Sequence, residues 1–166
     1  MDYEIKGYKS FNKEFKNIYG DKFECDKEYY TPGEIGGKFC NGFHFSKKFE
    51  ETFRFFDFDD NAILTEVECS GKIFNFYDEY YDYDIYSCSN IKIIRIIPRN
   101  EIIKMIEEID YSSGIEKVIS TFPLKNEEFE YLMNSKKNKY FNFKMELMKE
   151  YDKRVKKLIK NMDKHM

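Results

Sequence analysis

The spacing of the apolar residues changes at Pro98. Before this proline they recur mostly at every second position, as in residues 62–69, where Ile63, Val67 and Cys69 would share one face of a strand. After it they recur at intervals of three and four, which is the period of a helix. Strands first and helices later indicate an α+β fold, with a mostly antiparallel sheet in residues 1–97 and helices concentrated in residues 99–162.

Several segments before Pro98 carry the strand pattern. They are residues 3–11, 22–30, 39–45, 62–69, 72–76 and 91–97, with Gly71 turning the chain between the fourth and the fifth. Residues 11–19 are expected to form a short helix or a turn that stops at Gly20. A helix is also expected after Ser46, which suits an N-cap, with Phe49, Phe53 and Phe56 along one side.

After Pro98 we expect helices over residues 100–109, from Asn126 onward and over residues 138–162, with a short segment at residues 115–119. The last helix carries one apolar stripe, made of Phe141, Met145, Met148, Tyr151, Val155, Leu158, Ile159 and Met162. Burial of this stripe against the sheet is the preferred explanation of the helix. The alternatives are contacts of its lysines with nucleic acid phosphates or with an anionic membrane.

The chain has 166 residues, which suits a single domain over residues 1–166, strand-rich in 1–97 and helical in 98–166. Its net charge of −3 hides an asymmetry, because residues 136–166 contain eleven Lys and Arg against four Asp and Glu, a balance of +7. The other 17 basic and 27 acidic residues leave residues 1–135 with a balance of −10. Such a split predicts two surfaces of opposite sign, or a basic tail folded against its own acidic body.

Nothing in the sequence suggests export or a membrane span. No apolar run approaches the ~20 residues that cross a bilayer, and the acidic first residues do not resemble a signal peptide. The four cysteines, Cys25, Cys40, Cys69 and Cys88, form no C-x-x-C pair, and the spacing of Cys40 and His44 belongs to no standard zinc module. We therefore expect a cytoplasmic protein, in the host cytoplasm if it is phage-encoded, with reduced thiols and without metal or cofactor.

The most distinctive local composition is the acidic tyrosine tract, residues 77–84, which combines four acidic residues with four tyrosines. It consists of Tyr77, Asp78, Glu79, Tyr80, Tyr81, Asp82, Tyr83 and Asp84, and we expect it to form an exposed loop. Asp57, Asp59 and Asp60 form a smaller patch of the same chemistry. Carboxylates among tyrosines suit docking on a basic protein surface, because tyrosine adds contact area at a low entropic cost. The competing hypothesis is that the chain's own lysine-rich helix neutralises the tract.

An enzymatic alternative rests on Glu66 and Glu68, which form a glutamate-x-glutamate pair on a predicted strand. The pair resembles that of the mono-ADP-ribosyltransferases, in which it grips the ribose and polarises the glycosidic bond of NAD. This resemblance implies catalytic roles for both glutamates and for His44. The sequence departs from that family, because Lys9 lies near the place of the expected arginine and His44-Phe45-Ser46 replaces Ser-Thr-Ser. Since the solvent face of a strand also explains alternating glutamates, we favour a binding protein without catalytic residues.

Three motifs together resemble those of a family of small bacterial and phage proteins. They are Gly7-Tyr8-Lys9-Ser10-Phe11-Asn12-Lys13, Asn41-Gly42-Phe43-His44-Phe45 and a helix that ends near Phe55-Phe56-Asp57, within a likeness over roughly residues 5–103. The resemblance implies a mobile-element context, in which small acidic proteins often block host nucleases, as some anti-CRISPR proteins do. The leading hypothesis is inhibition of a nuclease or a CRISPR effector through the acidic tyrosine tract. The alternatives are a transferase-like enzyme and a scaffold or oligomerisation module.

Overall fold

The computed structural model of the chain describes residues 4–36, 41–54, 62–79, 83–138 and 142–166. The chain divides into two compact units, Met1–Pro98 and Arg99–Met166. The boundary coincides with the change of apolar spacing at Pro98, so the first unit holds the strands and the second holds the α-helices. That the two units act as a single domain stays a prediction.

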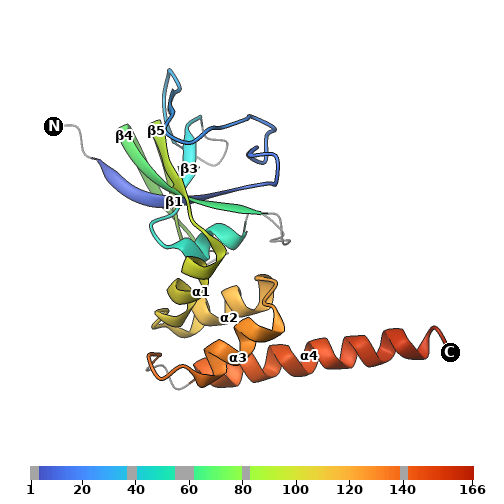
Figure 1. The fold of residues 1–166 in the computed structure, drawn as a ribbon. Helices are drawn as coiled ribbons and strands as arrows, with labels where there is room; N and C mark the ends of the chain where they lie inside the picture. Colours follow the sequence, from blue (N-terminus) through green and yellow to red (C-terminus); the bar gives the residue numbers. More distant parts are fainter. Residues whose placement is uncertain (1–3, 37–40, 55–61, 80–82, 139–141) are drawn as a thin grey trace. The chain divides into compact units, whose positions relative to one another are not determined.

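The first unit is built on a five-stranded sheet (Figure 1). Its strands are β1 (Ile5–Phe11), β2 (Glu28–Tyr30), β3 (Phe43–Phe45), β4 (Ile63–Asp78) and β5 (Tyr83–Ile96). They lie in the order β1-β4-β5-β2, β3 also pairs with β5, and each of these pairings is antiparallel. With helices in the second unit, this sheet confirms the predicted α+β fold.

The two longest strands, β4 and β5, form one hairpin where the sequence predicted separate strands. Residues 63–69 and 72–76 both lie in β4, and residues 91–96 are the end of β5. Gly71 does not turn the chain but lies in a bulge, where the register shifts between Ser70 and Ile73. Its φ of 75° and the nearby Ser89 and Asn90 side chains favour a residue without a Cβ atom.

Local backbone conformation corrects two shorter predictions and decides between the alternatives of a third. The strand expected over residues 22–30 is limited to β2, because Asp26 has a φ of 59° and interrupts the extended chain. Of the helix or turn expected over residues 11–19, the turn is found at residues 12–19, since Phe15 has a φ of 61° and the Asn12 side chain accepts hydrogen bonds from the N–H groups of residues 14 and 16. After Ser46 the described chain forms a 3-10 helix, η1 (Phe49–Arg54), rather than an α-helix, and Phe56 of the predicted helix lies outside the described residues. Of the strand predicted over residues 39–45, residues 41–45 are described, and the strand there is β3, without Asn41 and Gly42.

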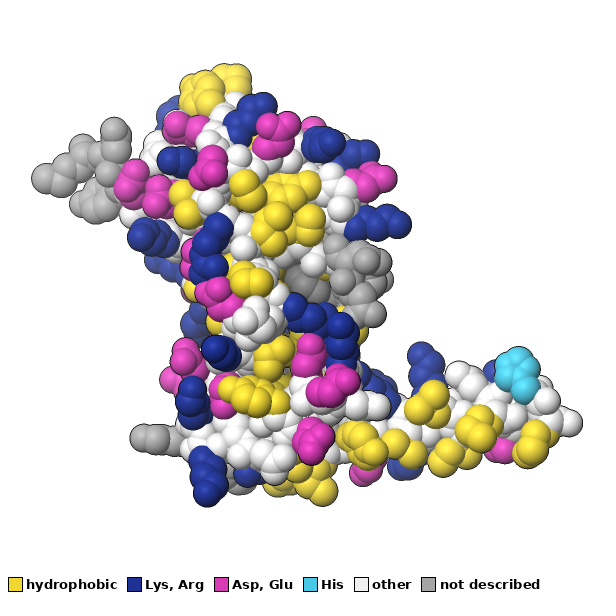
Figure 2. Space-filling model, in the orientation of Figure 1, with side chains coloured by type: hydrophobic (Ala, Val, Ile, Leu, Met, Phe, Trp, Pro, Cys, Tyr) yellow, Lys and Arg dark blue, Asp and Glu magenta, His cyan; other side chains and the backbone are white. Residues whose placement is uncertain are grey.

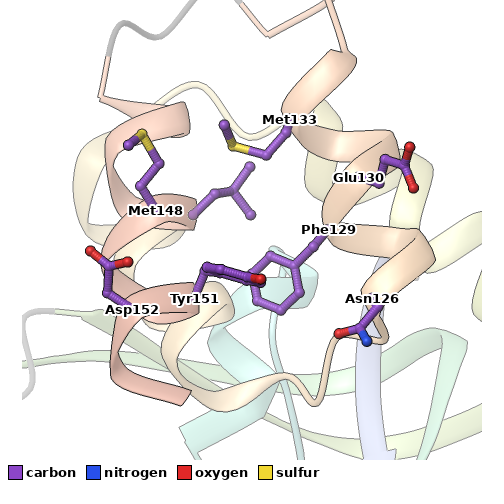
Figure 3. A pocket seen from close by; sticks show the side chains of 8 residues that line it. Asn126, Phe129, Glu130, Met133, Met148, Tyr151 and Asp152 are labelled. Carbon is purple, nitrogen blue, oxygen red and sulfur yellow. The ribbon is translucent and has the colours of Figure 1, made fainter. Parts of the chain in front are cut away.

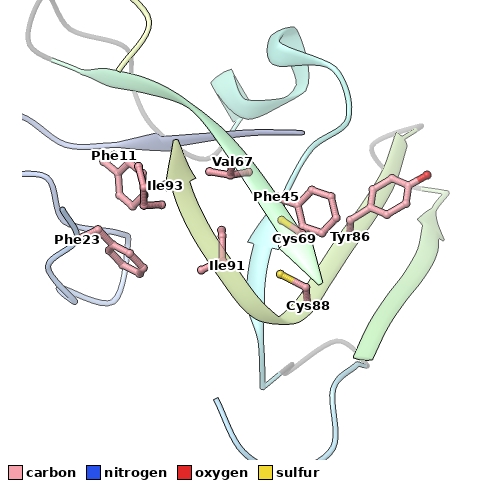
Figure 4. Close-up of a cluster of buried hydrophobic side chains, with 9 residues drawn as sticks. All are labelled: Phe11, Phe23, Phe45, Val67, Cys69, Tyr86, Cys88, Ile91 and Ile93. Carbon is pink, nitrogen blue, oxygen red and sulfur yellow. The ribbon is translucent and has the colours of Figure 1, made fainter. Parts of the chain in front are cut away.

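The core of the first unit is a cluster of aromatic, aliphatic and thiol side chains (Figure 4). It consists of Phe11, Phe23, Phe45, Val67, Cys69, Tyr86, Cys88, Ile91 and Ile93. Besides its pairing with β4, strand β1 is hydrogen-bonded to Ser46. The N–H of Tyr8 donates to the carbonyl of Ser46 at 2.7 Å, and the N–H of Ser46 donates to the carbonyl of Tyr8 at 2.9 Å. The cluster residues come from the strands β1, β3, β4 and β5 and, with Phe23, from the loop before β2.

The second unit contains α1 (Arg99–Glu107), α2 (Ser112–Thr121), α3 (Asn126–Asn134) and α4 (Phe143–Asp163). Helix α2 is longer than the predicted segment 115–119, and α1 begins one residue earlier and ends two residues earlier than the predicted range 100–109. The buried apolar side chains are mostly aliphatic and come from all four helices and the loops after α1 and α2: Ile102, Ile103, Ile106, Ile109, Ile115, Val118, Ile119, Phe122, Leu124, Phe129, Leu132, Phe143 and Leu147. The unit thus has a hydrophobic core of its own.

The apolar stripe of α4 is not buried. Six of its side chains are between 51% and 68% exposed, namely Met145, Met148, Tyr151, Leu158, Ile159 and Met162, and we call them the exposed stripe. The side chains that α4 buries are Phe143 and Leu147, one turn apart. The prediction that burial of the stripe explains this helix is therefore wrong, and Phe141 lies outside the described residues. No helix within the described ranges has the length and apolar character needed to span a membrane.

Candidate functional site

The acidic tyrosine tract lies at the end of the β4–β5 hairpin. Tyr77 and Asp78 are the last residues of β4, Glu79 follows in a turn, and Tyr83 and Asp84 begin β5. The prediction of a loop is therefore wrong for both ends of the tract, which are paired strand. Tyr80, Tyr81 and Asp82 lie outside the described residues.

Strand pairing places each tyrosine of these ends opposite a carboxylate. In the antiparallel register Tyr77 faces Asp84 and Asp78 faces Tyr83. Directly opposite residues share one face of a sheet, so the Tyr77 ring and the Asp84 carboxylate lie on the same side of the hairpin. Tyr77 is 54% exposed, and Glu79 and Asp84 are exposed as well. The structure brings these groups together in one small area at the end of a long hairpin.

The second acidic patch falls between η1 and β4. Asp57, Asp59 and Asp60 all lie outside the described residues. Their contribution to the same surface as the acidic tyrosine tract therefore stays a prediction.

The residues of the enzymatic alternative lie on two strands. Glu66 and Glu68 share one face of β4, where the Glu66 carboxylate accepts a hydrogen bond from Arg95 Nε at 2.7 Å. Glu68 lies opposite Lys6 on β1 and Lys92 on β5. Basic neighbours give both glutamates a structural role on the sheet surface, so their geometry does not by itself require a substrate.

His44 lies in β3, opposite Ser87 of β5. Burial, with a smaller contribution from the positive charge of Lys9, lowers the pKa of the His44 imidazole. Its backbone carbonyl accepts a hydrogen bond from Lys9 Nζ at 2.7 Å. The link between β3 and β1 therefore runs through the backbone of His44 rather than through its ring.

Lys9, which the sequence placed only near the position of an expected arginine, has a buried amine. It lies on β1 two residues before the buried Phe11, on the face that looks into the core, and its Nζ lies 5.7 Å from the centre of the Phe11 ring. Burial lowers the pKa of this amine from 10.5 to about 8, against small opposing effects of the Cys88 and Cys69 thiols. The strand period predicts the inward direction of Lys9, but only the fold supplies the carbonyl of His44, 35 residues away.

The cysteines show no sign of a metal centre within the described part of the chain. No group of three or more His, Cys, Asp or Glu side chains there could hold a metal ion, and Cys40 lies outside that part. Cys69 and Cys88 are buried in the core, whereas Cys25 is exposed. Burial raises the pKa of the Cys69 thiol, which keeps it protonated and unreactive at neutral pH.

The second unit has an open cleft of about 580 Å³ between α3 and α4, which we call the α3–α4 cleft. It is lined by Asn126, Phe129, Glu130, Met133, Leu147, Met148, Tyr151 and Asp152. In Figure 3 the apolar side chains of the two helices point toward one another. The Phe129 and Tyr151 rings pack edge to face, with their centres 6.1 Å apart. The charged residues of this lining, Glu130 and Asp152, are both acidic.

Comparisons with known proteins assign the first unit to a family. No curated protein and no solved structure matches the chain. The sequence model of one family, described as a domain of unknown function (DUF7666), matches residues 5–105. The match includes the whole sheet and most of α1, and it agrees closely with the likeness over residues 5–103 that the motifs of the sequence indicate. Because it covers well over half of the chain, the chain belongs to the DUF7666 family.

Proposed function

We propose that this chain is a small protein-binding module of phage or mobile-element origin. In this proposal it inhibits a host nucleic-acid-processing defence complex by docking the acidic tyrosine tract on a basic protein surface, such as the nucleic-acid channel of a nuclease or a CRISPR effector. The observation that carries the proposal is the position of Tyr77, Glu79 and Asp84, which are exposed together at the end of the β4–β5 hairpin.

Strand pairing supports the proposal because it fixes the groups before a partner arrives. Tyr77 and Asp84 are held opposite each other by the antiparallel ladder, so little backbone freedom is lost when they bind. An arginine of a partner could pair with the carboxylate and stack on the ring at the same time. Contacts of this kind concentrate affinity in a few residues.

The test is a set of charge-removing substitutions. Asp78→Ser, Glu79→Ser, Asp82→Ser and Asp84→Ser together should abolish binding to a partner captured from the native host and then purified, while the thermal unfolding midpoint changes little. The matched control removes four exposed carboxylates from elsewhere in the same unit, with Glu4→Ser, Glu24→Ser, Glu28→Ser and Glu34→Ser. Both variants change the net charge by the same amount, so only a specific site separates them.

Binding should also weaken steeply with salt, because the attraction between opposite charges at a surface is screened. Equal binding by the wild type and the tract variant would sink the proposal, and so would equal losses in the tract and control variants. An NAD-dependent mass increment on the captured protein, lost in Glu68→Gln, would instead support the transferase-like alternative.

A further inference from the structure

Helix α4 continues well beyond the contacts that hold it to the second unit. Its last firm anchor is Arg154, whose guanidinium donates hydrogen bonds to the carbonyls of Leu124 at 2.7 Å and Phe122 at 3.1 Å, and lies 4.8 Å from the Phe129 ring centre. Residues 156–166 are all exposed. A helical segment of this length is marginal in water unless an apolar face is covered.

The residues of this segment continue a regular apolar seam. Met148, Tyr151, Val155, Leu158 and Met162 follow one another at intervals of three, four, three and four, the spacing by which two helices pack along a common line. Figure 2 shows hydrophobic side chains in a row along α4. The seam includes four of the exposed stripe residues, and Val155 lies at its centre.

We propose that the exposed stripe binds a second copy of this chain, with the two α4 helices antiparallel. A two-fold arrangement about Val155 places Met148 and Tyr151 of each copy beside Met162 and Leu158 of the other. Each residue of the seam then has an apolar neighbour, and the projecting end of each helix is covered. The interaction is independent of the acidic tyrosine tract and goes beyond the function proposed above.

Charge complementarity selects this occupant. Residues 153–164 contain six Lys and Arg and one Asp, whereas the charged residues of the α3–α4 cleft are Glu130 and Asp152. Antiparallel pairing brings the basic end of each α4 to the acidic cleft of the other copy, while parallel pairing would bring two basic ends together. The same chain thus carries both halves of a complementary contact.

An anionic membrane is a poorer match for the stripe. Asp152 and Asp163 lie eleven residues apart, about three helical turns, on the edge of the stripe that also contains Ile159. Both carboxylates would face the anionic headgroups if the stripe entered a lipid surface, and their repulsion would offset part of the attraction of the neighbouring lysines. In an antiparallel pair they can instead face the lysines of the second copy.

The first experiment measures the mass of the full chain in solution. Light scattering after size exclusion should give a dimer at concentrations up to about 0.1 mM, where a micromolar Kd leaves most of the protein paired. Leu158→Ser with Met162→Ser should give a monomer that keeps the folded core of the second unit and loses helix content only in the uncovered end of α4. The control, Ile18→Ser with Tyr30→Ser, removes two equally exposed apolar side chains from the first unit and should stay dimeric.

A charge exchange then tests the antiparallel arrangement. One variant carries Glu130→Lys and Asp152→Lys, and another carries Lys156→Glu and Lys160→Glu. Each should lose at least tenfold in self-association, because the first variant makes the cleft as positive as the helix end, and the second lowers the net charge of residues 153–164 from +5 to +1. Their mixture should form a heterodimer, because each exchanged cleft then meets exchanged charges of the opposite sign. A monomeric wild type would overturn the proposal, and its co-sedimentation with phosphatidylserine vesicles would identify a membrane as the occupant instead. The tract variant should remain a dimer, so failure of either proposal is distinguishable from failure of the other.

Discussion

Replacing Lys9 with methionine should change how the stability of the first unit depends on pH. Lys9 extends its amine among Phe11 and the two core thiols, and burial lowers the pKa of that amine from 10.5 to about 8. Methionine keeps much of the side-chain length and removes the charge. The substitution therefore isolates the effect of placing a titratable amine in this core.

The sign follows from the two pKa values. Between them the unfolded chain still holds a proton that the folded chain has released, so the free energy of unfolding rises with pH over this range. The full difference corresponds to an upper limit of about 3.4 kcal/mol at about 1.36 kcal/mol per pKa unit. By about pH 9.5 the gain should have reached roughly 2 kcal/mol.

The assay is urea unfolding of the wild type and of Lys9→Met at pH 7 and about pH 9.5. Near pH 7 the free energies of unfolding of the two proteins should be similar. The variant gains stability because it no longer buries a poorly solvated charge, and it loses about 1–3 kcal/mol because the His44 carbonyl no longer has a hydrogen-bond donor. At the higher pH the variant should fall behind the wild type by roughly 2 kcal/mol.

Comparing the two proteins is essential because Cys69 titrates in the opposite sense. Burial raises the pKa of its thiol, so the unfolded chain ionises first and stability falls as pH rises above the ordinary thiol pKa. This effect is common to both proteins and cancels in their difference. Parallel stability curves for the wild type and Lys9→Met would refute the assignment of a lowered pKa to Lys9.

Two further substitutions test local features of the units. Gly71→Ala should lower the free energy of unfolding by about 1–3 kcal/mol, because its φ of 75° is unfavourable for alanine and the new methyl group would crowd Asn90; an unchanged urea midpoint would contradict this. In the second unit, burial alone would raise the pKa of Glu107, but hydrogen bonds from Ser135 and Tyr131 outweigh it and lower the pKa. The stability that Glu107 contributes is thus present above its unfolded pKa of about 4.3 and lost as pH falls through its folded pKa, so Glu107→Gln should flatten the acid side of a melting-temperature profile.

Periodicity predicted most of the sheet but not its continuity. Residues 62–69 alternate clearly, and they form the first half of β4 as expected. The sequence cannot distinguish a glycine that ends a strand from one that sits in a bulge, because both need a positive φ. The pairing partner decides whether the strand ends at the glycine. Here β5 pairs with β4 on both sides of Gly71, as far as Tyr83 opposite Asp78.

The same limit applies to the candidate site. The composition of the acidic tyrosine tract was evident from the sequence, whereas the pairing of Tyr77 with Asp84 depends on the hairpin register. The helical period of α4 likewise predicted a stripe but not what covers it, and Leu147, one turn from Phe143, is the side chain that enters the core. Amphipathic spacing specifies which face is apolar, and the neighbouring helices determine which part of that face is buried.

The charge asymmetry of the chain links the two proposals. If α4 pairs with a second copy, its lysines lie against Glu130 and Asp152 of that copy, and the basic C-terminal segment no longer needs the acidic tyrosine tract for compensation. A dimer would also present two tracts. A partner with two basic sites would therefore bind the dimer more tightly than the monomer, because the first contact raises the effective concentration of the second. The Leu158→Ser, Met162→Ser variant should therefore keep the intrinsic affinity of one tract for a single basic site and lose only the added affinity for a divalent partner. If its intrinsic affinity also fell, the tract and α4 would be parts of one binding surface.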